Sequence, residues 1–160
     1  MPRIGITGHT RLTVATVPLV TALVRARLAG HPPAELVGVT CLARGADQVF
    51  ARIVLELGGR VEVVLPAEDY REHAVGPDNL AEFDELLGRA ERVVTMPFAE
   101  SGRPAYLAAS ARMLAAVESV IAVWDGVPAT AMGSTADVVG QARRRGLPVA
   151  VIWPAGAERG

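Results

Sequence analysis

Three short segments of the chain combine small residues with hydroxyl and charged side chains, at spacings that suit a phosphate or a sugar. Glycine lets a ligand approach the backbone, the N–H groups at the start of a helix can face an anion, and hydroxyl groups add donors. For the third segment an ordinary capped helix is the alternative, with Ser134 or Thr135 as N-cap and Asp137 in the first turn. The segments are Gly8-His9-Thr10-Arg11, Arg44-Gly45-Ala46-Asp47 and Gly133-Ser134-Thr135-Ala136-Asp137.

Two carboxylates and two arginines in these segments could act on a ribosyl bond. Cleavage of such a bond builds positive charge on the ribose ring, so Asp137 or Asp47 could stabilise the transition state or orient water. Arg11 or Arg44 could hold a phosphate through paired N–H donors. Simpler roles are also open, because Asp47 suits the first turn of a helix and Arg44 suits an exposed turn.

Two residues beside these segments have similar alternatives. His9 could contact a phosphate, act as an acid near neutral pH, or bond the backbone of its own loop. Asp125 could bind ribose hydroxyls from the end of a strand, or form a turn with Gly126.

Length and charge narrow the class of protein. The chain has 160 residues, of which 51% are hydrophobic and 21% charged, which predicts one globular domain with a single core. The net charge of −1 offers no general attraction to a polyanion, so we expect nucleic acid to be an unlikely partner. The apolar runs are too short to span a membrane and no leader precedes the first strand, so we expect a cytoplasmic protein without membrane contact.

Residue usage excludes several kinds of chemistry. All 16 basic residues are arginine, which excludes Schiff-base catalysis and a phosphate-binding lysine. The chain has one cysteine and three scattered histidines, so a disulfide framework is impossible and no metal-ligand spacing occurs. We therefore expect no metal site and no required cofactor.

Apolar runs of strand length alternate with helical patterns along the chain. The expected strands cover residues 3–7, 36–41, 61–65, 92–96, 120–124 and 148–153, and the expected helices cover about 12–28, 46–57, 77–90, 104–117 and 134–145. Short, continuously apolar strands separated by helices predict an α/β fold, with a parallel sheet of about six strands and helices on both faces. Residues 1–154 are expected to form the domain and residues 155–160 a tail.

In such a sheet, ligands bind beyond the carboxyl ends of the strands, near the point where the strand order reverses. The candidate ligand-binding residues are therefore those that follow the strands. They are Gly8, His9, Thr10, Arg11, Arg44, Gly45, Ala46, Asp125, Gly126, Gly133, Ser134 and Thr135, with Asp47 and Asp137 as candidate catalytic carboxylates.

The segment Thr40-Cys41-Leu42-Ala43-Arg44-Gly45-Ala46-Asp47 resembles a strand-turn-helix motif of the SLOG (LOG/DprA-like) superfamily, in which a Gly-Ala-Asp or Gly-Ile-Asp step opens the second helix. Gly5-Ile6-Thr7-Gly8-His9 and Gly133-Ser134-Thr135-Ala136-Asp137 look like the other two nucleotide-binding turns of that superfamily. The resemblance spans nearly the whole chain in the right order. It implies a Rossmann-like sheet that binds a nucleotide or nucleotide derivative, and by analogy a homodimer.

Two classes of function follow from the resemblance. The LOG branch hydrolyses the N-glycosidic bond of nucleoside 5′-monophosphates, the DprA branch binds single-stranded DNA, and many smaller members look like ligand sensors. LOG enzymes carry P-G-G-x-G-T-x-x-E, whereas this chain has Val138 at the glutamate position and Asp137 beside it. We therefore expect a nucleotide-binding module or sensor, with a LOG-like phosphoribohydrolase as the alternative. The charge balance and the lack of interleaved aromatic and basic residues disfavour DNA binding.

Overall fold

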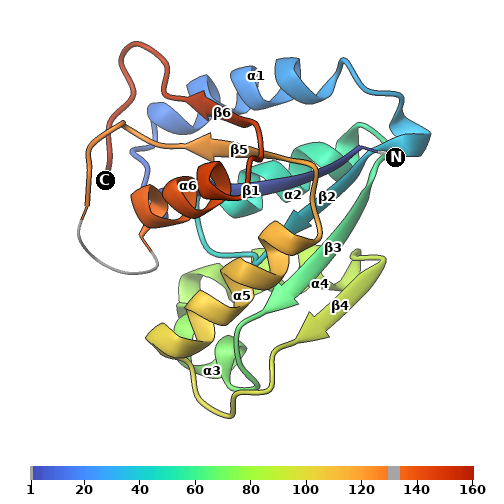
Figure 1. Ribbon diagram of the computed structural model, residues 1–160, viewed down its shortest axis with the longest axis vertical. Helices are drawn as coiled ribbons and strands as arrows, with labels where there is room; N and C mark the ends of the chain where they lie inside the picture. The colour runs from blue at the N-terminus through green and yellow to red at the C-terminus, as the bar shows by residue number, and fades with distance from the viewer. Residues whose placement is uncertain (1, 130–133) are drawn as a thin grey trace.

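The structure is a computed structural model that describes residues 2–129 and 134–160. Within these residues six strands form one parallel sheet in the order β4-β3-β2-β1-β5-β6 (Figure 1). The predicted parallel sheet of about six strands is therefore confirmed. The strands are β1 (Arg3–Gly8), β2 (Val37–Thr40), β3 (Arg60–Leu65), β4 (Arg92–Thr95), β5 (Ser119–Val123) and β6 (Val149–Ile152).

Helices cover both faces of the sheet, as predicted. One apolar cluster joins side chains of α1, α2 and α4 to one face, and a second joins α5 and α6 to the other. Two 3₁₀ turns and a short helix complete the connections. The helices are α1 (Thr16–Leu28), α2 (Ala46–Glu56), α3 (Tyr70–Ala74), α4 (Leu80–Gly88), α5 (Arg103–Ala115) and α6 (Thr135–Arg144), with 3₁₀ turns η1 (Pro33–Glu35) and η2 (Pro77–Asn79).

The strand sequences produce this layering because successive side chains point to opposite faces. In β1, Ile4 and Ile6 belong to the cluster under α1 and α2. In β2, a Cβ on Gly38 would lie 2.8 Å from the ring of Phe50, so this glycine lets α2 pack close to the sheet. Phe50 is fully buried there, and burial of a side chain of this size stabilises the fold by about 2 kcal/mol.

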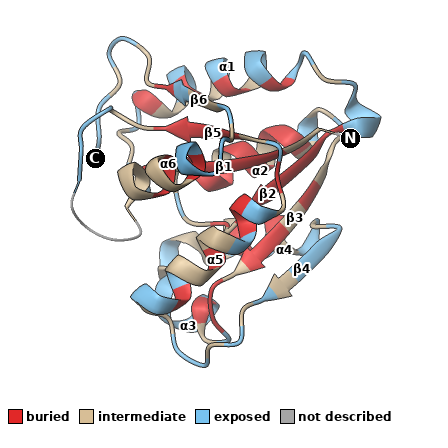
Figure 2. Ribbon diagram, viewed as in Figure 1, coloured by how far each residue is buried: buried red, intermediate tan, exposed pale blue. Residues whose placement is uncertain are grey.

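Burial is concentrated in the centre of the sheet (Figure 2). All four residues of β2 are buried, whereas three of the four residues of the edge strand β4 are exposed. No helix in the described ranges is long and apolar enough to cross a membrane.

Two segments differ from the sequence-based expectations. The stretch between β3 and the helix expected at about 77–90, where no helix or strand was expected, contains α3, and residues 77–79 form η2 ahead of α4. The first helix begins at Thr16 rather than near residue 12, because Thr13 ends the preceding loop: its carbonyl accepts the N–H groups of Thr16 and Val17. The hydroxyl groups of Thr13 and Thr16 also lie 2.6 Å apart.

Residues 155–160, expected to be a tail, pack along the loop that follows β1. Leu12 and Arg159 form an antiparallel bridge, and the N–H of Gly160 donates to the carbonyl of Arg11 at 3.0 Å. This segment therefore borders the carboxyl end of β1.

Candidate functional site

The strand order reverses beside β1. From β1 the chain passes through α1 to β2 on one side, whereas β5 lies on the other side of β1. The two strand ends are in register, with Gly8 opposite Val123, and the N–H of His9 donates to the carbonyl of Val123 at 3.1 Å. This reversal point is where an open parallel sheet forms a ligand crevice.

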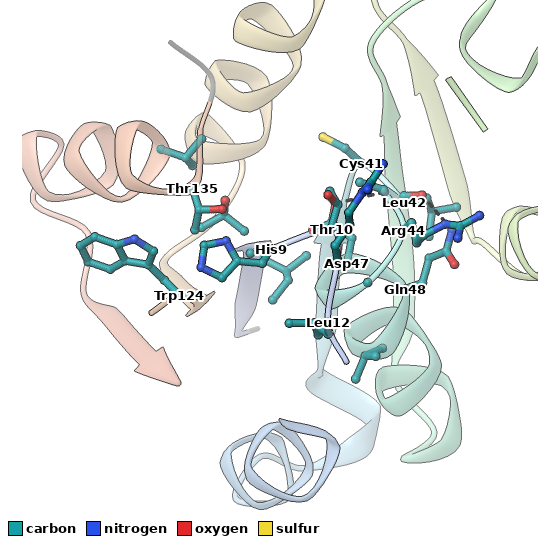
Figure 3. A pocket seen from close by; sticks show the side chains of 18 of the residues that line it. His9, Thr10, Leu12, Cys41, Leu42, Arg44, Asp47, Gln48, Trp124 and Thr135 are labelled. Atoms are coloured by element: carbon teal, nitrogen blue, oxygen red, sulfur yellow. Dashed lines mark hydrogen bonds between the residues drawn. The ribbon is translucent and has the colours of Figure 1, made fainter. Parts of the chain in front are cut away.

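A groove of about 1480 Å³ runs along this edge of the sheet (Figure 3). Its walls come from the loop after β1, the loop after β2, the segment around η2 and the start of α6. The structure thus brings together most of the residues singled out from the sequence. Those that line the groove are Gly8, His9, Thr10, Arg11, Arg44, Gly45, Asp47, Ser134 and Thr135.

The other residues singled out from the sequence do not line this groove. Ala46 and Asp137 are the first and third residues of their helices' opening turns, and Asp125 and Gly126 lie in the turn after β5. Gly133 lies outside the described residues.

His9 links the ends of β1 and β5. Its side chain is 7% exposed, and its Nε2 lies 3.1 Å from the backbone N of Asp125 and 3.3 Å from Asp125 Oδ1. In the neutral form with the proton on Nδ1, Nε2 accepts the N–H of Asp125. Burial lowers the pKa of His9, the charge of Arg159 lowers it further, and the Asp125 carboxylate opposes both. The edge of Trp153 packs against the ring with centroids 5.4 Å apart. His9 is therefore a neutral side chain that joins two loops at neutral pH.

Asp125 organises the turn after β5. Its Oδ1 accepts the N–H of Val127 at 3.0 Å, and Gly126 takes a φ of 81° in the same turn. Burial works against its ionisation, but the Val127 N–H, His9 and Arg159 lower the pKa of Asp125 overall. The indole N–H of Trp124 donates to the carbonyl of Val127 at 3.1 Å. The turn therefore fixes both a charged carboxylate and an indole ring beside the groove.

Asp47 lies beneath the loop that follows β2. It is 7% exposed, and its Oδ2 accepts the N–H of Ala43 at 3.2 Å. Burial raises its pKa to about 7, although hydrogen bonds from Ala43, Thr40 and Cys41 lower it in part. Asp47 thus holds the loop from below and is poised between its two protonation states near neutral pH.

The same loop contains a strained residue. Leu42 is 1% exposed and has a φ of 55°, a conformation that non-glycine residues rarely adopt. Its N–H donates to the Thr40 hydroxyl at 3.0 Å, and its carbonyl accepts from Gln48 Nε2 at 3.2 Å. Gln48 and Thr40 were not singled out from the sequence, since a glutamine in a helix and a threonine in a strand carry no special signal.

Gly45 brings the loops after β1 and β2 into contact. Its φ is 84°, and a Cβ there would lie 2.6 Å from the carbonyl oxygens of both His9 and Thr10. The N–H of Ala46 donates to the His9 carbonyl at 3.2 Å. Only glycine fits this contact, so the two loops form one wall of the groove.

Two arginines of the predicted site differ in their surroundings. Arg44 Nη2 donates to Asp78 Oδ1 at 2.5 Å, linking the loop after β2 to η2. This hydrogen bond raises the pKa of Arg44 and lowers that of Asp78. The Arg11 guanidinium has no hydrogen bond or ion pair within residues 2–129 and 134–160, so its donors remain available to a ligand.

The start of α6 is capped as the simpler alternative predicted. Ser134 is the N-cap, and its hydroxyl accepts the N–H of Asp137 at 3.2 Å. The Asp137 carboxylate accepts from Gln141 Nε2 at 3.0 Å, one turn further along α6. The cap and a ligand site are compatible here, because Ser134 and Thr135 line the groove.

Arg159 is a lining residue that the sequence analysis did not single out. Its Nη1 lies 3.7 Å from Asp125 Oδ2. No sequence pattern marks it, because its position depends on backbone pairing of residues 155–160 with the loop after β1. Within the described residues, no group of three or more His, Cys, Asp or Glu side chains could hold a metal ion.

No protein-family model and no curated protein sequence matches the chain. Solved structures with the same architecture include DNA processing protein A (DprA) from Streptococcus pneumoniae, with a TM-score of 0.71 at 18% identity. DprA from Helicobacter pylori has a TM-score of 0.65 at 16% identity, and the molybdenum cofactor carrier protein from Chlamydomonas reinhardtii 0.51 at 16%. The chain shares the Rossmann-like fold of these proteins.

The shared fold extends over nearly the whole chain. The alignments cover 98%, 99% and 94% of this chain, and 52%, 68% and 75% of the pneumococcal, Helicobacter and Chlamydomonas proteins. This chain therefore spans about half the length of the pneumococcal DprA. The resemblance inferred from the three glycine-containing turns is confirmed as a similarity of fold.

The comparison contradicts one expectation from the sequence, that nucleic acid is an unlikely partner. The Helicobacter DprA structure concerns the single-stranded DNA binding mode of that protein. The expectation was based on the net charge of −1, which averages over the whole surface. Local charge decides such binding, and Arg11, Arg44 and Arg159 all line the groove.

Proposed function

We propose that the protein binds a nucleotide, or a ligand derived from one, in the groove at the carboxyl edge of the sheet. The observation that carries the proposal is the convergence of the loops after β1 and β2 with the start of α6 on one groove at the strand reversal point. Parallel sheets bind nucleotides at this place. Two proteins with the same fold, a DprA and a molybdenum cofactor carrier, are described by what they bind or carry.

The charges along the groove support separate places for the phosphate and the sugar. The start of α6 offers N–H groups without helical partners, and the exposed Arg11 offers a guanidinium. Asp125 is held in its charged form and can accept hydrogen bonds from ribose hydroxyls. The helix N–H groups and the arginine therefore suit a phosphate, and the carboxylate beside the groove suits ribose hydroxyls.

An aromatic wall supports a base as part of the ligand. Trp124 lines the groove, and Figure 3 shows it beside His9. Its indole N–H is already bonded to the Val127 carbonyl, so the ring does not need a polar partner from the ligand. Stacking of a base on such a ring contributes about 1–3 kcal/mol.

Binding without turnover is favoured by the state of the two candidate carboxylates. Asp137 is bonded to Gln141 on α6 and does not line the groove. Asp47 does line it, but its carboxylate accepts hydrogen bonds from the loop above it. Hydrolysis of an N-glycosidic bond is the second candidate, because a carboxyl with a pKa of about 7 can donate a proton to a leaving base.

The test is a binding panel combined with an assay for released base. The probes are adenosine, guanosine, cytidine and uridine 5′-monophosphates, the four nucleosides, ribose 5-phosphate and a short oligodeoxythymidylate. We expect at least one monophosphate or the oligonucleotide to raise the unfolding temperature of the protein and to give a measurable Kd, with no free base detected by chromatography. A wild-type protein that binds none of these probes would refute the proposal.

Variants of single residues test which side chains contact the ligand. Arg11→Ala should weaken binding of the phosphorylated probes by about tenfold, because its exposed guanidinium has no other partner among the described residues and one charge-assisted hydrogen bond contributes about 1.5 kcal/mol. Arg145→Ala is the matched control, since Arg145 is an exposed arginine at the far end of α6 and does not line the groove. Release of base that stops in Asp47→Asn would favour hydrolysis over simple binding.

A further inference from the structure

The segment comprising residues 157–160 is fixed to a wall of the groove by backbone hydrogen bonds. Its partner is the loop after β1, which carries His9 and Arg11 into the groove. The segment therefore has a defined position rather than a free one. The bonds run from Gly160 N to Arg11 O at 3.0 Å, from Thr13 N to Glu158 O at 3.2 Å, and from Glu158 N to Thr16 Oγ1 at 2.8 Å.

This attachment brings Arg159 to the reversal point of the sheet. Its guanidinium approaches Asp125 Oδ2 at 3.7 Å, and its side chain is 58% exposed. The distance is too long for a hydrogen bond, so the pairing orients the guanidinium while its N–H donors stay available.

Other arginines of the groove are already committed to carboxylates. Arg25 donates to Glu56, and Arg44 donates to Asp78. Arg52 donates to Glu85 at 2.7 Å. Among the lining arginines of the described residues, Arg11 and Arg159 therefore have the most donor capacity left for a ligand.

We propose that Arg159 is a ligand-binding residue that contacts the phosphate group of the nucleotide. The inference rests on the proposed function and adds to it the residue that distinguishes phosphorylated from unphosphorylated ligands. A guanidinium presents two parallel N–H groups that match two phosphate oxygens. With His9 neutral, the Arg159 guanidinium balances the Asp125 carboxylate, and the exposed Arg11 adds a further positive charge to the groove.

The charge supplied by the attached segment thus compensates for the carboxylate at the end of β5. Without Arg159, the Asp125 carboxylate would repel a bound phosphate, and Arg11 would be left to offset this repulsion. We therefore expect removal of the guanidinium to reduce phosphate binding specifically, and to leave contacts with the base and ribose in place.

The experiment compares a monophosphate with its own nucleoside by isothermal titration calorimetry. The probes are adenosine, guanosine, cytidine and uridine 5′-monophosphates. The monophosphate that wild-type protein binds most tightly is then compared with its own nucleoside in each variant. Arg159→Ala should weaken the affinity for the monophosphate by about tenfold or more and change the affinity for the nucleoside by less than about twofold. Arg159→Lys should restore part of the loss, since it restores the charge but not the paired donors.

Arg145→Ala controls for the loss of any exposed arginine, and unfolding midpoints show whether the loop after β1 remains folded. Equal affinity of wild type and Arg159→Ala for the monophosphate would overturn the inference alone. Equal losses for monophosphate and nucleoside would also overturn it, because Arg159 would then act through Asp125 or the loop. If the wild type binds no probe, the proposed function fails and this inference fails with it.

Discussion

The pKa of Asp47 makes a prediction about stability that follows directly from its burial. The carboxyl is 7% exposed, and its pKa rises from the ordinary value of 3.8 to about 7. The folded state therefore binds the proton more tightly than the unfolded state, so the free energy of unfolding falls as pH rises from about 4 to about 7. Below and above this window, Asp47 does not change the free energy of unfolding as pH changes. A rise of this size in pKa corresponds to about 4 kcal/mol across the window.

Asp47→Asn removes the ionisation while keeping an oxygen that can accept the N–H of Ala43. We predict that this variant becomes more stable relative to wild type as pH rises, by up to about 4 kcal/mol between pH ~4 and ~7, with a plateau above. The measurement is urea unfolding of both proteins from about pH 4 to about pH 9. The difference between the two free energies isolates Asp47, because all other titrating groups are common to both.

Asp84→Asn is a control with the opposite sign. Hydrogen bonds from Arg71 lower the pKa of Asp84, so its contribution to stability is present at neutral pH and is lost as pH falls through the lowered pKa. A difference between Asp47→Asn and wild type that stays constant with pH would show that Asp47 ionises like an exposed carboxyl. The burial argument for the loop after β2 would then be refuted.

The remaining predictions concern the loop contact and the aromatic wall. Gly45→Ala should lower the free energy of unfolding by more than about 2 kcal/mol, because its Cβ would lie 2.6 Å from two carbonyl oxygens. Gly146→Ala is the control: Gly146 has a φ of 75° with open space around it, so this variant should lose about 1 kcal/mol. Equal losses of the two variants in urea unfolding would contradict the close contact. In Trp153→Phe, which leaves Trp124 as the single indole, a bound nucleotide should quench fluorescence while ribose 5-phosphate should not. Equal quenching by both ligands would remove the base from the Trp124 wall.

The fold was predictable because burial on both faces forces each strand to be continuously apolar. The run from Val120 to Trp124 contains only apolar residues, and the structure forms β5 over Ser119–Val123. Helix α3 was not predictable in the same way, because only Tyr70 of its five residues is buried and the rest present no apolar face. Its formation depends on tertiary contacts, such as the packing of Tyr70 against Phe83 at 6.0 Å.

The place of the candidate site was predictable, but its polar contacts were not. Parallel strands end at one edge, so residues that follow β1 and β2 must meet there whatever their side chains. The hydrogen-bond partners of these side chains could not be predicted, since Arg44 and Asp78 are 34 residues apart and no local spacing connects them. Arg159 depends on backbone hydrogen bonds to the loop after β1, and such bonds leave no trace in residue types.

The loop after β1 contacts the loop after β2, the turn after β5 and residues 158–160, and this affects how a ligand would bind. Gly45 packs against its backbone, His9 joins it to Asp125, and Gly160 bonds to Arg11. These contacts hold the backbone of the walls in position, so binding costs little ordering of the backbone. The exposed arginine side chains are the parts left to reorganise. Affinity should therefore depend more strongly on the charges of Arg11 and Arg159 than on loop closure. Raising the salt concentration should then weaken binding of phosphorylated ligands more than binding of unphosphorylated ones.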